Sequence, residues 1–274
     1  MPNEVTLSPA SELGLEPLAS LFNAAYEGYA VPMHVDAGAM EFMLEAMDLV
    51  PERSRVAWRD GAPVGVAMLG VRGTRGWVGG MGVVTAARRG GVGRLLMRAL
   101  IEEARAAGVR ELFLEVLEQN TSARALYEEL GFRPLRRLEV WTYAGAPPAN
   151  HGTAQACDPR EARRRIAASR TEREPWQRAD DTVDRLDVST PALRAVTTPG
   201  GDAVYRVTDG RASVLQLAAG SETAAGVLLD TIRTRDGVNV VRFLNVPSTD
   251  TAVAALARRD AKCELAQTEM SLAL

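Results

Sequence analysis

The spacing of apolar residues divides the first half of the chain into alternating helices and strands. Apolar side chains recur every three or four residues over 13–27 and 37–49, which predicts two amphipathic helices. Extended apolar runs follow at 54–59 and 63–71, and the Asp-Gly dipeptide between them is typical of a hairpin turn. The other elements predicted in this half are strands at 76–84, 111–117 and 135–143 and helices at 91–107 and 122–130. Strands that alternate with helices in this way favour a layered α/β domain.

A change of composition separates the second half of the chain from the first. Residues 144–159 contain three prolines, two glycines and no periodicity, which is typical of a linker. The arginine-rich helix predicted at 161–173 fits either a solvated helix face or an interaction surface. Beyond it, the pattern predicts strands at 203–207, 212–218, 238–245 and 264–273 and helices at 224–235 and 249–259.

The second half repeats the element order of the first half: hairpin, loop, helix, strand, helix and strand. Aligning the two halves at paired leucines of their central helices also brings Gly93 onto Gly226. Such a repeat indicates a duplication. We therefore expect two tandem domains of one topology, the first at 1–146 and the second at 161–274, joined by a linker at 147–160.

Length, charge and cysteine content narrow the class of protein. A chain of 274 residues is long enough for one large or two medium domains with buried cores. Its 32 basic and 35 acidic residues leave a net charge of −3, so no strong cationic field favours nucleic acid or an anionic membrane. No apolar run is long enough to span a bilayer, and a signal-peptide pattern is absent. Cys157 and Cys263, far apart in sequence, indicate neither a disulfide framework nor a metal cluster, so we expect a cytoplasmic protein.

A turn rich in glycine and arginine follows the strand predicted at 76–84 and opens the next helix. Its residues are Arg88, Arg89, Gly90, Gly91, Val92, Gly93 and Arg94. Backbone N–H groups at a helix N-terminus attract anions together with the helix dipole, and glycines let a ligand approach the backbone closely. The lysine and hydroxyl of a P-loop are absent, and the glycine order differs from that of dinucleotide-binding folds. The turn therefore predicts a cradle for a pyrophosphate.

A second motif lies some 27 positions beyond the last glycine of this turn. It consists of Asn120, Ala123 and Tyr127, followed by Gly131-Phe132. Together with the Arg-x-x-Gly-x-Gly turn and the strand before it, this motif resembles the GNAT superfamily of acyl-CoA-dependent N-acetyltransferases. The resemblance is close over about residues 56–143 and loose over the first fifty.

The resemblance implies a mostly antiparallel sheet in which two parallel strands, near 81–84 and 111–117, separate into a V. The pantetheine arm of acetyl-CoA is expected in this V, and its pyrophosphate on the turn. The residues expected to bind acetyl-CoA are Val83, Val84, Thr85, Arg88, Arg89, Gly90, Gly91, Val92, Gly93, Arg94, Asn120, Ala123 and Tyr127. Acetyl-CoA would serve as co-substrate, and no metal is expected because backbone amides and arginines neutralise the phosphates.

The reaction that the resemblance implies is direct attack of a neutral primary amine on the thioester carbonyl. A backbone amide on the splayed strand, that of Val84, is expected to stabilise the oxyanion. Tyr127 occupies the general-acid position of the family and would protonate the leaving thiolate. The alternative for Tyr127 is a core tyrosine that packs on Leu96.

The expected general base is Glu115, which matches a glutamate that acts through water in the branch acetylating protein N-termini. Many small-molecule GNATs share this feature, and the alternative for Glu115 is an ordinary strand carboxylate. His34 is the second candidate for the base. Tyr26, Tyr29 and His34 belong to a segment expected either to line the acceptor site or to pack against the core.

The second half lacks the chemistry of the first. In place of Arg88, Gly91, Gly93, Asn120 and Tyr127 it has Ser221, Ala224, Gly226, Thr249 and Leu256. We therefore expect catalysis in the first domain only, with a small-molecule or peptide amine as acceptor. The second domain would cover the acceptor side or mediate association, for example in a homodimer. The alternative hypothesis is a non-catalytic module that binds acyl-CoA.

Overall fold

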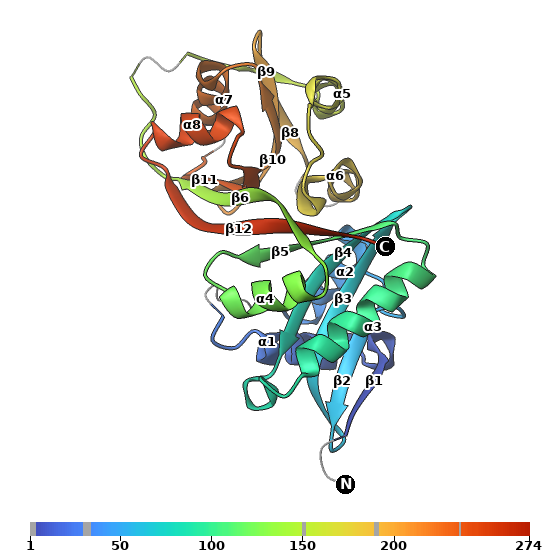
Figure 1. Cartoon of the computed structure of the whole chain (residues 1–274). Helices are drawn as coiled ribbons and strands as arrows, with labels where there is room; N and C mark the ends of the chain where they lie inside the picture. The colour runs from blue at the N-terminus through green and yellow to red at the C-terminus, as the bar shows by residue number, and fades with distance from the viewer. Residues whose placement is uncertain (1–3, 30–33, 150–151, 189–191, 236) are drawn as a thin grey trace. The chain divides into compact units, whose positions relative to one another are not determined.

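Figure 1 shows the fold of the chain, a computed structural model coloured from the N-terminus to the C-terminus. The structure describes residues 4–29, 34–149, 152–188, 192–235 and 237–274. The chain forms two compact units, the first made of residues 1–135 and 269–274 and the second of residues 136–268. Within the segment expected as a linker, Gln155–Cys157 forms the short strand β7. The assignment of separate roles to the two halves stays a prediction.

The first unit has helices on both faces of a β-sheet. Its own strands are β1 (Val5–Pro9), β2 (Arg55–Arg59), β3 (Ala62–Arg72), β4 (Arg75–Val83) and β5 (Glu111–Leu117), adjacent in that order. Its helices are α1 (Leu15–Ala25), α2 (Ala37–Ala46), α3 (Val92–Ala106) and α4 (Thr121–Glu129), with 3-10 turns at Ala10–Glu12 and Thr85–Ala87. Figure 1 shows α3 and α4 on one face of the sheet and α1 and α2 on the other. The α/β layered fold expected from the apolar pattern is confirmed.

The parallel strands β4 and β5 separate into a V, as expected. They pair only from Arg75 opposite Glu111 to Trp77 opposite Phe113, although both strands continue further. Gly79 is an extra residue in β4 relative to β3, and this bulge lies immediately beyond the last parallel pair. A bulge bends and twists its strand, which turns the end of β4 away from β5.

The C-terminal residues complete the core of the first unit. Strand β12 (Lys262–Ala273) lies beside β5 in the strand order, and its residues from 269 onward belong to the first unit. Met270 is fully buried in the same apolar cluster as α3, with Leu272 packed against it. The N–H of Leu274 donates to the carbonyl of Arg110, 2.9 Å away. The first unit therefore needs the last residues of the chain.

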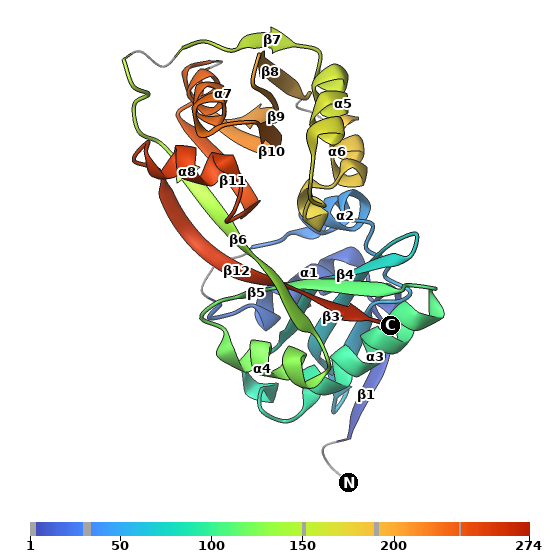
Figure 2. The ribbon, with the colours of Figure 1, turned by 45° about the horizontal axis from the view of Figure 1, so that its top comes forward.

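The second unit has the same layered construction. Its strands are adjacent in the order β6 (Arg133–Tyr143), β11 (Val240–Pro247), β10 (Arg211–Ala219), β9 (Gly201–Thr208), β8 (Arg194–Thr198) and β7. Its helices are α5 (Pro159–Ser169), α6 (Asp180–Asp187), α7 (Glu222–Thr234) and α8 (Thr251–Ala257), with a 3-10 turn at Trp176–Arg178. Figure 2 shows α7 and α8 on one side of strands β8 to β10 and α5 and α6 on the other side.

The expected repeat of element order is confirmed, and it extends to the details of strand pairing. Strands β10 and β11 run parallel only from Arg211 opposite Val240 to Val214 opposite Phe243. Leu215 then forms a bulge relative to β9, as Gly79 does relative to β3. The sequence pattern missed β1, β7, β8 and α6. None of the helices in the described parts of the chain has the length and apolar character needed to traverse a membrane.

Candidate active site

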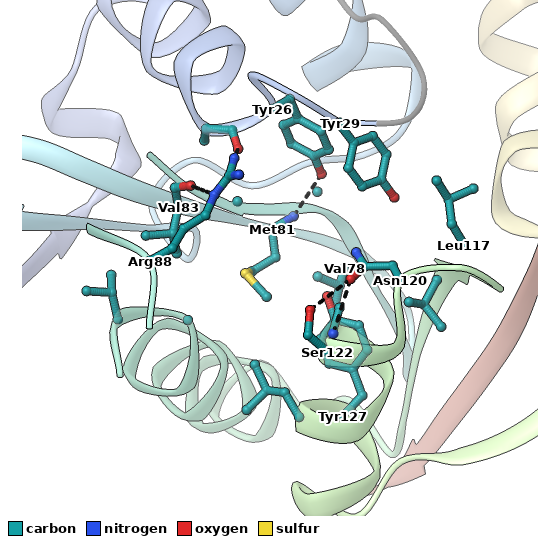
Figure 3. Close-up of a pocket in the computed structure, with 18 of the residues that line it drawn as sticks. Tyr26, Tyr29, Val78, Met81, Val83, Arg88, Leu117, Asn120, Ser122 and Tyr127 are labelled. Carbon is teal, nitrogen blue, oxygen red and sulfur yellow. Dashed lines mark hydrogen bonds between the residues drawn. The ribbon is translucent and has the colours of Figure 1, made fainter. Parts of the chain in front are cut away.

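A cavity of about 730 Å³ in the first unit is lined by the separated ends of β4 and β5 (Figure 3). Most of the expected site residues line it: Tyr26, Tyr29, Val83, Arg88, Arg89, Gly91, Val92, Gly93, Arg94, Glu115, Asn120, Ala123 and Tyr127. Four expected residues are not in this lining: Val84, Thr85, Gly90 and His34. His34 is exposed, three positions before α2, and residues 30–33 of the expected acceptor segment lie outside the described residues.

The turn before α3 has the backbone geometry of an anion cradle. Gly91, the N-cap of α3, has a φ of 79°, a left-handed conformation that favours glycine. A Cβ atom built on Gly91 would meet nothing within 4 Å, so the space above the turn is open. The first N–H groups of a helix have no partner within the helix, and those of α3 begin here beside the cavity.

The arginines of the turn are engaged differently from the expectation. Arg88 donates to the carbonyls of Val83 (2.9 Å), Ala25 (3.1 Å) and Glu27 (2.9 Å), so its guanidinium links the end of α1 to the end of β4. Arg94 forms an exposed ion pair with Glu129 on α4. These arginines therefore fix the walls of the cavity as well as contributing positive charge.

Tyr127 on α4 is almost completely buried and lines the cavity from the side of α3. Burial raises the pKa of its hydroxyl, and the nearby Tyr26 and Tyr29 raise the pKa further. A hydroxyl in this state remains protonated at neutral pH and is available as a proton donor. Because Tyr127 also belongs to the core cluster that contains Leu96, its ring packs in the core whatever the role of its hydroxyl.

Glu115 on β5 is held at the cavity by a residue that the sequence pattern did not single out. The Nε1–H of Trp77, on β4, donates to Oε2 of Glu115 at 2.8 Å. This bond joins β4 to β5 around the point at which the two strands separate. Trp77 looked like an ordinary apolar strand residue, and only the pairing register reveals its contact with Glu115.

The expectation that the Val84 amide stabilises an oxyanion is wrong. The N–H of Val84 donates to the carbonyl of Val64 at 2.9 Å, so it belongs to the pairing of β4 with β3. Three positions earlier, the N–H of Met81 lines the cavity and donates to the hydroxyl of Tyr26 at 3.2 Å. Met81 thus has an amide on the splayed strand that faces the cavity and is bonded to a side chain.

Asn120 fixes the start of α4. Its Oδ1 accepts from the N–H of Ala123 and from the hydroxyl of Ser122, both at 3.2 Å (Figure 3). An asparagine in this position satisfies an unpaired N–H of the first helical turn. The cap therefore orients the helix that carries Tyr127.

In the second unit, strands β10 and β11 correspond to β4 and β5, and a buried arginine lies where they separate. Arg178 is 2 % exposed and donates to the carbonyls of Leu215 and Asn245, each at 3.1 Å. These carbonyls lie on β10 and β11 just beyond their last parallel pair. The guanidinium also pairs with Glu174 at 3.1 Å and lies 4.3 Å from the ring centroid of Phe243. The opening between these strands is therefore filled by a side chain of the unit itself.

Comparison with known proteins identifies the first unit. A profile of the Acetyltransferase (GNAT) family matches residues 17–132. The N-terminal part of the chain is a GNAT acetyltransferase domain. The profile match contains the turn before α3, the V of β4 and β5, and α4 with Tyr127. Enzymes of this family use acetyl-CoA and acetylate amines.

The relatives of this GNAT domain include an enzyme named as an alanine N-acetyltransferase of a ribosomal protein. Over 45 residues, the chain is 51% identical to the [Ribosomal protein bS18]-alanine N-acetyltransferase of Salmonella typhimurium. The aligned segment covers 16% of this chain and 30% of the relative.

Solved structures extend the fold comparison to the whole chain. A GCN5-related N-acetyltransferase from Sphaerobacter thermophilus superposes with a TM-score of 0.76 at 17% identity, covering 100% of this chain and 96% of that one. A tandem GNAT protein from the clavulanic acid biosynthesis pathway gives a TM-score of 0.63 at 17% identity, with 98% of each chain covered. The chain as a whole thus has a tandem GNAT fold.

Proposed function

We propose that this protein is an acetyl-CoA-dependent N-acetyltransferase that acts through its first unit on a primary amine. The observation that carries the proposal is that one cavity is lined by the open turn at Gly91, by Met81 and by the buried Tyr127. These groups match the three parts of an acyl-CoA thioester: a pyrophosphate, a carbonyl oxygen and a sulfur.

The residues that line the cavity offer partners for the pyrophosphate and the pantetheine arm of acetyl-CoA. The N–H groups at the start of α3 would hold the pyrophosphate, with Arg89 adding charge. The free edge of β4 around Val83 would pair with the pantetheine arm, because β5 leaves that edge beyond Trp77. Acetyl-CoA supplies the activated acetyl group, and the protein supplies the groups that position it.

Tyr127 and Glu115 take the two proton-transfer roles in this proposal. The hydroxyl of Tyr127 donates to the sulfur as the carbon–sulfur bond breaks. Its raised pKa keeps it protonated at neutral pH, and a proton passed to the sulfur is replaced from solvent. Glu115, oriented by Trp77, removes a proton from the attacking amine through water. The N–H of Met81 donates to the carbonyl oxygen as negative charge develops on it.

The location of the activity in the first unit is supported by the interior of the second. In the second unit, the buried guanidinium of Arg178 fills the opening between β10 and β11. The equivalent opening of the first unit, between β4 and β5, is the one that would accept acetyl-CoA. At the outer end of that opening, the hydroxyl of Thr251 donates to the carbonyl of Ala219 at 3.1 Å. We therefore propose that each chain binds one molecule of acetyl-CoA.

The proposal is tested with the purified full chain, acetyl-CoA and a panel of amines, with thiol release as the readout. The panel contains a peptide with an N-terminal alanine, suggested by the name of the Salmonella relative, together with a polyamine, amino acids and an aminoglycoside. We expect thiol release that depends on one class of acceptor and one acetyl-CoA per chain by calorimetry. Binding without release for every acceptor would favour the non-catalytic module, and two equivalent sites would refute the assignment to the first unit.

A further inference from the structure

The hydroxyl of Tyr26 lies at the β4 amide that the proposed reaction assigns to the acyl carbonyl oxygen. It accepts a hydrogen bond from the N–H of Met81 at 3.2 Å, and Figure 3 shows the ring reaching over the strand to this amide. Tyr26 comes from the C-terminal end of α1, 55 residues before Met81 in the chain. Nothing in the sequence pattern predicted this contact.

Strand geometry explains why Met81 has a side-chain partner. Successive residues of a strand point their N–H and carbonyl groups to opposite edges. The N–H of Val84 points to β3. The alternation therefore directs the backbone N–H groups of Met81 and Val83 to the opposite edge of β4, from which β5 has already separated. A buried N–H without a partner is costly, and the Tyr26 hydroxyl supplies one.

The Tyr26 ring is held in place by its neighbours. It stacks on Phe22 with 4.6 Å between ring centroids and contacts Tyr29 edge to face at 5.2 Å. A Cβ atom on Gly80 would lie 3.2 Å from the Tyr26 hydroxyl oxygen and 2.8 Å from the Phe22 ring, so glycine at this position lets both rings approach β4. Burial raises the pKa of Tyr26, so its oxygen stays a neutral hydroxyl.

We propose that Tyr26 is a positioning residue that caps the Met81 amide in the free protein and yields it to the carbonyl oxygen of the acyl thioester. The inference rests on the proposed function. Free CoA has no carbonyl at that position, so CoA leaves the bond between Tyr26 and Met81 in place. Tyr26 would therefore lower the affinity for acetyl-CoA relative to CoA, and it would satisfy the amide again once the acetyl group has been transferred.

Calorimetric titration of the full chain with acetyl-CoA and with CoA measures this competition. In Tyr26→Phe the Met81 amide has no hydroxyl partner before binding and gains the carbonyl on binding. We expect the ratio of the CoA Kd to the acetyl-CoA Kd to rise about three- to tenfold, the range for one net hydrogen bond. Tyr205→Phe is the control, since it removes a tyrosine hydroxyl from β9 of the second unit, outside the cavity, and its ratio should equal that of the unaltered chain.

Hydrogen exchange at the Met81 amide gives a second readout that needs no ligand. We expect slow exchange in the unaltered chain and in Tyr205→Phe, and faster exchange in Tyr26→Phe. A ratio that stays constant in Tyr26→Phe, or that falls because the hydroxyl donates to the bound carbonyl, would overturn the inference while leaving the proposed function standing. A chain that binds neither acetyl-CoA nor CoA would refute the proposed function itself and the inference with it.

Discussion

Replacing Gly93 by alanine distinguishes what the fold needs at this position from what a bound cofactor needs. Gly93 is the second residue of α3, and a Cβ atom there would lie 3.6 Å from Cδ2 of Leu126 and 3.8 Å from the side chain of Met81. Both are ordinary van der Waals distances, so the free protein has room for the methyl group. Alanine is the better helix former, and at this first-turn position we expect a gain of about 0.5 kcal/mol, or about 1–2 °C in Tm.

The same methyl group should weaken the binding of acetyl-CoA. Gly93 lines the cavity at the turn on which the pyrophosphate is proposed to lie, and the added atom would occupy space next to the backbone N–H groups. Excess volume in a packed site costs about 1–3 kcal/mol, which corresponds to an increase in Kd of about 5- to 150-fold. Calorimetric titration measures the Kd, and a thermal melt measures the stability of the same preparation.

Gly38→Ala is the matched control, because Gly38 is likewise the second residue of its helix, α2. A Cβ atom there would lie 3.6 Å from Asp36 Oδ1, and Gly38 is not among the residues that line the cavity. Its Tm should change by a similar amount while the Kd for acetyl-CoA stays the same. If Gly93→Ala binds acetyl-CoA as tightly as the unaltered chain does, the proposed position of the pyrophosphate is wrong.

Other variants test the acid, the buried arginine and the last strand. Tyr127→Phe should lower kcat by about 10²-fold with little change in the Kd for acetyl-CoA; unaltered turnover in steady-state assays would assign Tyr127 to packing alone. Because burial raises the pKa of Tyr127 above its ordinary value, the hydroxyl should stay protonated, and kcat should show no alkaline decline below about pH 10; a decline that Tyr127→Phe abolishes would contradict this. Arg178→Ala should destabilise the second unit by about 3–5 kcal/mol in denaturant titrations, since it removes a buried partner of Glu174; a loss below 1 kcal/mol would show that the opening closes without it. Deleting residues 269–274 should lower the Tm of the first unit and promote aggregation, and a monomeric product of unchanged Tm by light scattering and calorimetry would count against the role given to the last strand.

The periodic part of the fold was predictable because it depends on local spacing. The apolar stripe of α3 and the glycine turn before it lie within 20 consecutive residues, so their pattern is visible without any tertiary information. The same turn gave the expectation of a pyrophosphate cradle, which stays a prediction, and the structure adds a left-handed φ at Gly91. Short elements such as β7 and β8 have too few residues to show a period, and the sequence pattern missed them.

The contacts that refine the site depend on where strands end, which local spacing does not encode. The resemblance to the GNAT superfamily pointed to the Val84 amide as oxyanion donor, but the N–H of Val84 is directed to β3. The availability of Met81 follows from the bulge at Gly79 together with the early end of the parallel pairing. Arg178 lies between 173 and 203, where the sequence pattern predicted no element, and its importance comes from β10 and β11, which are distant in sequence.

The division of β6 and β12 between the units explains why a second copy without the catalytic motifs would be retained. Residues 136–143 of β6 belong to the second unit, where they pair antiparallel with β11. In return, the last residues of β12 belong to the first unit, beside β5. Strand β5 carries Glu115, so an uncovered β5 edge would expose unpaired backbone groups next to the proposed active site. A fragment ending at residue 146 would lose Met270 and Leu272 from its core, and we expect it to aggregate, whereas the same fragment with residues 262–274 added as a peptide should regain both solubility and activity.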